Sequence, residues 1–308
     1  MTGPRATPDS APTAPWPGVL DRIVACPKCG SATLALSPEP HCTACDFRSH
    51  SEDGIPALLV EDRLHDGHHA EVQAQTAAVQ DYYENEDKLT CHWDRISADE
   101  LPALLGWPSG VGLDLGCGTG TAGGSLKKAG MSVVGVDLSR PCLAAAARRV
   151  DAVVQVDAAH LPFADKSFDA VVSRGCLHHL DDAPAALAET ARVMKPGARA
   201  VFMDPREYSW LEPIKHRLRH ADEAFTDDHH AYTPKQYAEL IGAHFEIERQ
   251  ICWHPFGILV AHSLDLVPLP TALPRRGLAQ GLLSLDRALN HTPLRKVGHL
   301  LGVVAKKS

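Results

Sequence analysis

The clearest fold signal in this chain is the stretch Val111-Gly-Leu-Asp-Leu-Gly-Cys-Gly-Thr-Gly120. It reads as a short apolar strand that enters a glycine-rich turn, with Gly116, Gly118 and Gly120 at alternate positions. Glycine lets the backbone approach a ligand closely, and the first N–H groups of the next helix can bind polar or anionic groups. Because dinucleotide-binding folds share such turns, the turn alone is weak evidence for any one fold, and the flanking sequence must supply the further evidence.

Further apolar strands follow the turn at regular intervals, and helical segments separate them. We expect these strands at Met131–Val136, Val153–Val156, Phe168–Ser173 and Ala200–Met203. A helix is expected over Ala183–Met194, ending at Lys195-Pro-Gly197. Alternating strands and helices predict an α/β fold with a doubly wound sheet, whose strand ends line a ligand crevice.

Acidic residues stand directly after several of the expected strands. Asp137 follows the second strand, 21 residues after Gly116 (137 − 116), where such folds place the acid that binds ribose hydroxyls. Asp157 and Ala158 follow the third strand and are placed to contact an adenine edge. Ser139 should cap the next helix. These positions predict a cofactor that contains adenosine.

Four of the nine cysteines lie close together in two C-x2-C pairs. Cys26 and Cys29 form the first pair, and Cys42 and Cys45 form the second after twelve intervening residues. Two such pairs can present four thiolates to one Zn²⁺ tetrahedrally, and four protein ligands leave no open position for a substrate. The spacing predicts a structural zinc; a redox C-x-x-C pair or unrelated buried thiols are the alternatives.

The run from Cys26 through Asp53-Gly-Ile-Pro-Ala-Leu-Leu59, about 40 residues, resembles the zinc-ribbon family of the small activator subunit that partners tRNA and translation-factor methyltransferases. Some rRNA methyltransferases also begin with a zinc ribbon that binds RNA. Between Leu20 and Val60, however, this ribbon has three basic residues against five acids. Because RNA binding needs a basic surface, a packing or regulatory role fits better.

With these motifs in order, the chain resembles the class I S-adenosylmethionine-dependent methyltransferases, in the branch that includes the ubiquinone and menaquinone C-methyltransferases. The matching segments are DLGCGTG, VVGVD, DAAHLPF, SFDAVVS with LHHL, and RVMKPG, over roughly Asp114 to Pro205. The resemblance implies a Rossmann-like sheet of seven strands and S-adenosylmethionine as cofactor. It does not specify the methyl acceptor.

The resemblance also implies a set of cofactor contacts at the turn and the strand ends. They are Asp114 and Gly116 for the methionine portion, Gly118 and Gly120 for the turn, Asp137 for the ribose, Leu138 for the adenine face, and Asp157 with the Ala158 amide for the adenine edge. Tyr82 and Tyr83 precede the first strand, where family members often place an aromatic over the cofactor. Tyr83 is the predicted contact.

Two positions depart from the family pattern. Ala198 replaces a glycine that usually follows Pro196. Arg174 stands where a small or amide residue is commoner, and we include it among the predicted cofactor-binding residues. A fixed cation beside the cleft would favour an anionic group on the cofactor or the substrate.

Histidines are the candidates for acid–base chemistry. Methyl transfer from a sulfonium depends mainly on alignment, and a general base helps only if the acceptor must lose a proton. His178, after the fourth strand, is the candidate catalytic base, with a packing role as the alternative; packing is preferred for His179. His229 and His230 are a second candidate pair, for a metal or a base, with a polar loop as the alternative.

The charge of the 308-residue chain is unevenly distributed. The formal total is −8, yet Pro268–Ser308 holds seven basic residues and one acid, so this tail is +6 and the remainder −14. An acidic total disfavours coating of nucleic acid. No apolar run is long enough to span a membrane, and the start, with five prolines in 17 residues, has no signal-peptide core. We expect a cytoplasmic protein with reduced cysteines.

These observations predict three units: a disordered leader over 1–19, a zinc ribbon over 20–61 and a methyltransferase domain over 62–308. About 45 residues with helical apolar spacing separate the last two expected strands, Phe245–Ile251 and Leu301–Ala305. We therefore predict a helical insertion at about 255–297, which together with the basic cluster Lys215-His-Arg-Leu-Arg-His220 forms a substrate lid or interaction surface. Transient contact with an anionic membrane and a solvated cap or dimer face are both open interpretations.

The combined hypothesis is an S-adenosylmethionine-dependent methyltransferase that acts on a small molecule, anionic or amphipathic in character. One alternative is an rRNA or tRNA methyltransferase in which the ribbon aids RNA binding, although the acidic ribbon disfavours nucleic acid as a partner. Another is a cofactor-binding scaffold that acts mainly through its ribbon. The motifs specify neither the acceptor atom nor the oligomeric state.

Overall fold

The computed structural model describes residues 18–60, 85–207, 231–254, 256–265, 270, 273–298 and 300–308. Most of the predicted leader lies outside these ranges. So do Tyr82 and Tyr83, the basic cluster at 215–220, and the histidine pair His229 and His230. The predictions for these residues stay predictions.

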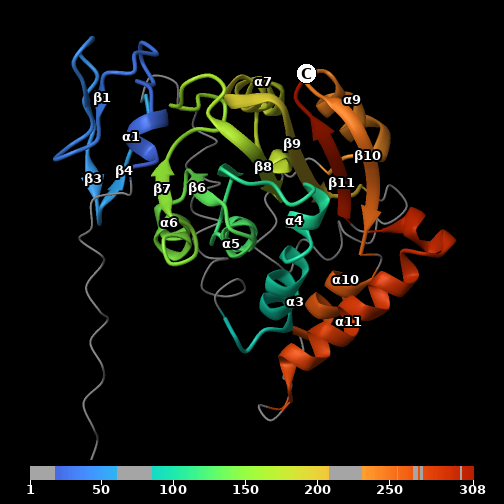
Figure 1. Ribbon diagram of the computed structural model, residues 1–308. Helices are drawn as coiled ribbons and strands as arrows, with labels where there is room; N and C mark the ends of the chain where they lie inside the picture. The colour runs from blue at the N-terminus through green and yellow to red at the C-terminus, as the bar shows by residue number, and fades with distance from the viewer. Residues whose placement is uncertain are drawn as a thin grey trace, which may run out of the picture.

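A seven-stranded sheet forms the centre of the molecule (Figure 1). In chain order its strands are β5 (Val111–Leu115), β6 (Ser132–Asp137), β7 (Ala152–Gln155), β8 (Phe168–Arg174), β9 (Met194–Pro205), β10 (Glu246–Trp253) and β11 (Leu300–Lys306). Their spatial order is β10-β11-β9-β8-β5-β6-β7, and β11 runs antiparallel to both of its neighbours. The predicted doubly wound, Rossmann-like α/β fold with seven strands is confirmed.

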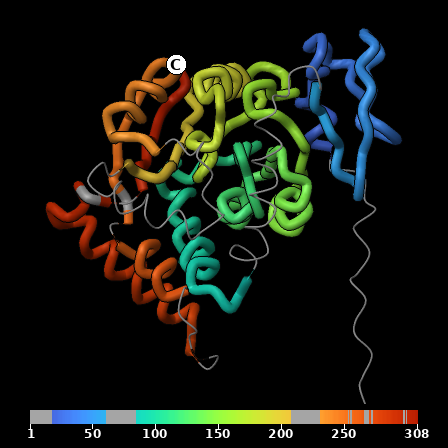
Figure 2. The backbone as a smooth tube through the Cα atoms, turned by 180° about the vertical axis from the view of Figure 1, so that it is seen from behind, coloured from blue at the N-terminus to red at the C-terminus, as the bar shows by residue number. Residues whose placement is uncertain are grey.

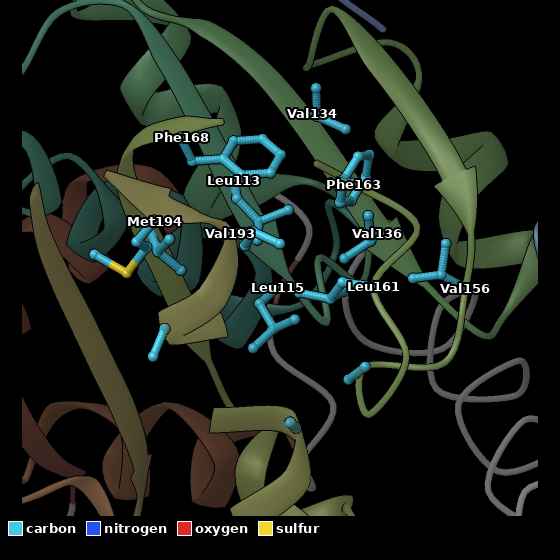
Figure 3. Close-up of a cluster of buried hydrophobic side chains, with 14 of the residues drawn as sticks. Leu113, Leu115, Val134, Val136, Val156, Leu161, Phe163, Phe168, Val193 and Met194 are labelled. Carbon is cyan, nitrogen blue, oxygen red and sulfur yellow. The ribbon is translucent and has the colours of Figure 1, made fainter. Parts of the chain in front are cut away.

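Helices cover both faces of this sheet because the central strands are apolar on both sides. On one face, α7 (Ala183–Val193) and α9 (Pro234–Gly242) pack against the strands, together with the ribbon helix α1 (Leu20–Ile23). Figure 3 shows part of this cluster, in which Phe163 lies beside Val136 of β6 and Phe168 of β8 lies beside Leu113 of β5. The other face is covered by α5 (Thr121–Lys128), α6 (Arg140–Ala146) and the short α4 (Leu101–Leu104).

The strand β9 begins earlier than predicted. Lys195-Pro-Gly197 was expected to separate a helix from a strand, but α7 ends at Val193 and β9 starts at Met194. Met194 pairs with Phe168, and the next paired residue on β9 is Arg199, so the intervening residues bulge out of the ladder. A bulge accommodates the proline that a regular ladder would exclude.

The N-terminal module lies beside β7, the edge strand of the sheet (Figures 1 and 2). Besides α1 it contains β1 (Leu34–Ala35), β2 (His41–Cys42), β3 (Ser51–Glu52) and β4 (Ile55–Pro56). Ala57 forms a parallel bridge with Gln155 of β7, and the Leu58 N–H donates to the Gln155 carbonyl at 2.8 Å. The module therefore continues the sheet and covers its exposed edge.

Three helices form a separate layer below the sheet in Figure 1: α3 (Leu89–Ala98), α10 (Gly257–Asp265) and α11 (Arg275–Leu289). A 3₁₀ turn, η4 (Pro293–Val297), leads from α11 to β11. Elements α10, α11 and η4 fall within the range predicted for the helical insertion. Among the described residues, no helix combines the length and apolarity needed to cross a bilayer.

Candidate functional site

The glycine-rich turn after β5 is held close to its neighbours and leaves space on one side. Gly116, Gly118 and Gly120 all have positive φ, at +62°, +49° and +78°. A Cβ on Gly116 would lie 2.3 Å from the Cys176 Sγ, and one on Gly120 would lie 2.9 Å from the Ala146 Cα. A Cβ on Gly118 would meet no atom of the described residues within 4 Å. The turn is therefore packed at Gly116 and Gly120 and open to a ligand at Gly118.

Asp137, at the end of β6, ties this turn to the next helix. One carboxylate oxygen accepts a 2.8 Å hydrogen bond from the Gly118 N–H, and the other accepts one of 2.8 Å from the Ser139 N–H. Burial raises the pKa of Asp137, and the two N–H donors oppose that rise. Ser139 caps α6 as predicted, accepting from the Cys142 N–H at 3.4 Å.

Asp114 lies deeper, within β5, and is only 1% exposed. Its carboxylate accepts a 2.7 Å hydrogen bond from the Gly123 N–H in the first turn of α5. Burial raises the pKa of Asp114 to about 7, although the Gly123 N–H lowers it. This contact makes Asp114 an anchor between β5 and α5, and its predicted place beside the methionine portion stays a prediction.

Asp157 follows β7 and is buried. One oxygen accepts from the Ala159 N–H at 2.9 Å, and the other lies 2.7 Å from the His160 Nδ1. The His160 ring thus fixes the orientation of the carboxylate predicted to contact adenine. Sequence reasoning missed His160, although its position three residues after Asp157 is a readable signal.

The turn, Asp137 and Asp157 stand at the carboxyl ends of β5, β6 and β7, which are neighbours in the sheet. Carboxylates are therefore present at adjoining strand ends beside the open space at Gly118. These carboxylates can accept hydrogen bonds from the hydroxyls and amino group of an adenosine moiety, and a parallel sheet binds ligands at this edge. The residues present fit the cofactor class predicted from the sequence.

Arg174, predicted as a fixed cation beside the cleft, is paired with residues of α3. Its guanidinium makes a 2.9 Å ion pair with the Asp94 carboxylate of α3 and a 2.9 Å hydrogen bond to the Ser97 Oγ. The guanidinium carbon also lies 5.8 Å from the ring centroid of Trp93. Because α3 supplies a carboxylate and an aromatic face, the charge of Arg174 is compensated within the protein. Asp94 lies 80 residues earlier in the chain, and no sequence signal links the two.

His178 belongs to a buried polar chain on the other side of the crevice. It lies in the 3₁₀ turn η3 (Leu177–His179) after β8, and its Nδ1 is 2.7 Å from the Asp204 Oδ1 at the end of β9. The Tyr237 hydroxyl of α9 donates to the Asp204 Oδ2 at 2.6 Å. Asp204 is fully buried. Its carboxylate therefore fixes the histidine ring with Nδ1 as the donor and Nε2 as the acceptor.

The sequence indicated this arrangement only in part. Asp204 directly follows the expected strand Ala200–Met203, but its position alone assigns it no role, and nothing in the sequence singles out Tyr237. The ring of His179 packs against that of His178, with 3.8 Å between the centroids. This contact agrees with the preferred packing interpretation of His179.

The four N-terminal cysteines converge on one point. Their sulfur atoms all lie within 4.8 Å of one another, with 3.6 Å between Cys26 and Cys45 and 3.8 Å between Cys29 and Cys42. Four thiolates at a zinc–sulfur distance of about 2.3 Å stand about 3.8 Å apart in a tetrahedron. The Ala44 N–H donates to the Cys42 Sγ at 3.3 Å, as amides do at thiolate sites. The cluster fits a tetrahedral metal.

Comparison with known proteins supports the central part of this site. Residues 113–202 match the family model described as a methyltransferase domain. This part of the chain is thus similar to methyltransferase domains. It covers β5 from Leu113 onward, the glycine-rich turn, Asp137, Asp157 and His178.

Demethylmenaquinone methyltransferases are among the curated relatives of this domain. The protein of Tropheryma whipplei (strain Twist) is 31% identical over 157 residues, which cover 47% of this chain and 64% of that protein. The protein of Beutenbergia cavernae is 40% identical over 120 residues, covering 38% of this chain and 49% of that protein. This chain thus spans between half and two thirds of the length of these relatives.

Solved structures share the fold of the methyltransferase domain. Phosphoethanolamine N-methyltransferase 2 of Haemonchus contortus, solved with S-adenosylhomocysteine, superposes with a TM-score of 0.55 at 20% identity, over 80% of this chain and 61% of that one. The [4+2]-cyclase SpnF superposes with a TM-score of 0.50 at 22% identity, over 73% of this chain and 86% of that one. At these identities the likeness concerns the fold, which here serves both a methyltransferase and a cyclase.

Proposed function

We propose that this chain is an S-adenosylmethionine-dependent methyltransferase that acts on a small-molecule acceptor. One observation carries the proposal: three features lie at the same edge of the sheet. They are the open glycine turn, two carboxylates suited to bind adenosine, and a histidine that a buried carboxylate orients. The match of residues 113–202 to a methyltransferase domain supports the same activity.

The proposed roles follow from position. Asp137 and Asp157 would hold the ribose and adenine, Leu138 and the Ala158 amide would complete the adenine contacts, and Gly118 would let the turn pass close to the cofactor. When bound, the cofactor supplies an electrophilic methyl group on a sulfonium. The main task of the protein is then to hold the acceptor in line with that group and to exclude water.

His178 is the proposed general base for an acceptor that must lose a proton. Asp204 holds Nδ1–H at 2.7 Å, so Nε2 is the atom that receives the proton. Tyr237, through the second oxygen of Asp204, limits rotation of that carboxylate. Asp204 and Tyr237 are positioning residues in this scheme, because neither touches the acceptor.

Calorimetry with S-adenosylmethionine tests the cofactor assignment directly. We expect the wild-type protein to bind and Asp137→Ala to bind at least about tenfold more weakly, because its carboxylate contacts both the turn and the proposed ribose position. Glu239→Ala, on the exposed surface of α9, is the matched control. Absence of binding by the wild-type protein, or equal binding by Asp137→Ala, contradicts the assignment.

An assay with a methyl-labelled cofactor tests the acceptor class. The named relatives methylate demethylmenaquinone, so a demethylated quinone is the first acceptor to offer. Fractionated small-molecule extract and bulk RNA are the parallel arms. Label in RNA but not in small molecules would support the rRNA or tRNA alternative. We rank that alternative second because the ribbon is acidic.

We also propose that Cys26, Cys29, Cys42 and Cys45 hold one structural Zn²⁺ and that residues 20–61 form a zinc ribbon serving the domain over 62–308. The ribbon bridges Gln155 of β7, and Arg140 of α6 pairs with Glu52 at 3.2 Å. It therefore supports the strand that leads to Asp157. Elemental analysis of purified protein should show one zinc per chain; far less would contradict the metal assignment.

A further inference from the structure

Exposed apolar side chains are concentrated on the helical insertion. Within the described ranges, six large apolar side chains are exposed, and five of them belong to the insertion: Phe256, Leu259, Val260, Leu285 and Leu294, each between 37% and 52% exposed. The sixth is Trp107, in the turn before β5. Scattered exposed apolar residues are normal, but their accumulation on one element marks an interaction surface.

These five residues come together at one end of the insertion. The Asp286 carboxylate of α11 accepts hydrogen bonds from the Phe256 and Gly257 N–H groups, at 3.0 Å and 2.9 Å, which places the start of α10 against this part of α11. Leu285 adjoins Asp286, and η4, with Leu294, follows α11 after three residues. Figures 1 and 2 both show α10 and α11 side by side at the margin of the molecule, away from the N-terminal module.

The acidic and basic side chains of the insertion occupy different places: the acids make contacts within the protein, and the exposed charges are basic. Its two acids are used internally: Asp286 caps α10, and Asp265 accepts from the Leu89 and Thr90 N–H groups at the start of α3. The outward-facing charges are basic. Arg276, Arg295 and Lys296 are exposed and make no ion pair within the described part of the chain.

We propose that this surface, formed by Phe256, Leu259, Val260, Leu285 and Leu294 with Arg295 and Lys296, docks onto an anionic phospholipid bilayer. Apolar side chains can enter the headgroup region while arginine and lysine meet lipid phosphates. A second copy of this chain is a poorer occupant, because a twofold contact would bring the same basic residues together without an acid to pair with them.

The position of the surface relates it to the acceptor. The insertion leaves the sheet after β10 and returns at β11, where Trp253 pairs with Leu300 and Leu300 with Pro205 of β9. That is the carboxyl edge of the parallel strands, which also bears the proposed cofactor site. Docking would therefore bring the acceptor side of the site near the lipid; this link rests on the proposed function, whereas docking itself does not.

Co-sedimentation with vesicles tests the proposal on the full chain. Vesicles of equimolar phosphatidylglycerol and phosphatidylcholine should bind the protein, pure phosphatidylcholine vesicles should bind it far less, and high salt should weaken binding. Arg295→Glu/Lys296→Glu and, separately, Leu259→Glu/Leu285→Glu should each lower the partition coefficient about tenfold or more. The control Lys235→Glu/Arg249→Glu makes the same change of charge away from the insertion and should bind as the wild type does.

Unchanged thermal unfolding and cofactor binding of the variants would show that they fold. Equal binding to both kinds of vesicle, no loss in the charge variant, or no binding at all overturns the proposal. A concentration-dependent dimer in sedimentation velocity, abolished by Leu259→Glu/Leu285→Glu without any vesicle binding, would overturn it in favour of a second copy. Vesicle binding without cofactor binding would contradict the proposed function and leave the docking surface standing.

Discussion

At the residue scale, the acids of the site differ in what they do because their surroundings differ. Asp137 and Asp157 lie at strand ends beside the open turn, whereas Asp114 is buried against the first turn of α5. Asp204 is buried as well, but it contacts a histidine and a tyrosine rather than backbone alone. The same side chain can thus bind a ligand, anchor a helix or orient a base.

Asp114 should make the stability of the protein depend on pH. Its pKa is about 7 in the folded protein against an ordinary value of 3.8, so folding favours the protonated form. Its contribution is complete below about pH 4 and is lost as the pH rises through about 7. Asp114→Asn, which preserves an acceptor for the Gly123 N–H, should be more stable than the wild type above pH 7, by about 4 kcal/mol at most. Urea unfolding at several pH values measures this; a pH-independent difference between the two proteins would contradict it.

The pair of His178 and Asp204 should matter to turnover and not to cofactor binding. His178→Ala should lower kcat by about 10²–10⁴-fold for an acceptor that loses a proton, and Asp204→Asn should cause a smaller loss in the same direction. Calorimetry should give an unchanged Kd for S-adenosylmethionine. A parallel loss of cofactor affinity or of Tm in both variants would assign these residues a structural role instead.

At the scale of elements, the turn between β5 and α5 combines tight packing with an open face. Gly116 and Gly120 are fixed by contacts to Cys176 and Ala146, so the loop has one shape before any ligand arrives. Helix α3 is fixed in a different way: Asp265, from the end of α10, caps it across 176 residues of sequence. Local packing thus fixes the turn, and a long-range cap fixes the start of α3.

Gly116→Ala and Gly118→Ala should therefore differ. Both force a side chain into a positive-φ conformation, at a cost of about 1–2 kcal/mol. Gly116→Ala also drives its Cβ into the Cys176 Sγ and should lose a further 1–3 kcal/mol, roughly, in the free energy of unfolding. Gly118→Ala should fold nearly normally yet bind S-adenosylmethionine poorly.

Chemical denaturation and calorimetry separate the two effects. The double variant Gly116→Ala/Cys176→Ala should recover part of the lost stability, since it removes the clashing sulfur. Equal stability of the two single variants would contradict the packing argument.

At the scale of the whole molecule, two additions extend the methyltransferase sheet at opposite ends. The N-terminal module continues the sheet beyond β7, and the insertion covers α3 beyond the β10 and β11 end. A buried histidine, His254, lies between α3 and α11, with 5.0 Å between its ring centroid and that of Trp93 and 3.6 Å between its Nδ1 and the Asp286 carboxylate. The N-terminal module and the insertion both lie outside residues 113–202, the part that matches the family model.

Removal of zinc should weaken cofactor binding from a distance. The ribbon holds Gln155 and packs beside Asp157, so chelation should lower Tm and reduce affinity for S-adenosylmethionine severalfold. Cys29→Ser should do the same, whereas Cys252→Ser, outside the cluster, should not. Metal-free protein with unchanged Tm and unchanged affinity would show that the cluster has no such role.

The sequence by itself determined the order of strands and helices, the glycine turn, the acids at strand ends and the spacing of the four cysteines. These features follow from local periodicity and residue chemistry, which depend only on residues close together in the sequence. The side-chain partners follow from tertiary packing: Asp94 for Arg174, Asp204 and Tyr237 for His178, His160 for Asp157, Asp265 as the cap of α3 and Asp286 as the cap of α10. A side chain's partner depends on which distant segments pack against it. Arg174 therefore forms an ion pair within the protein. The outward-facing charges of the insertion are all basic because its two acids cap helices.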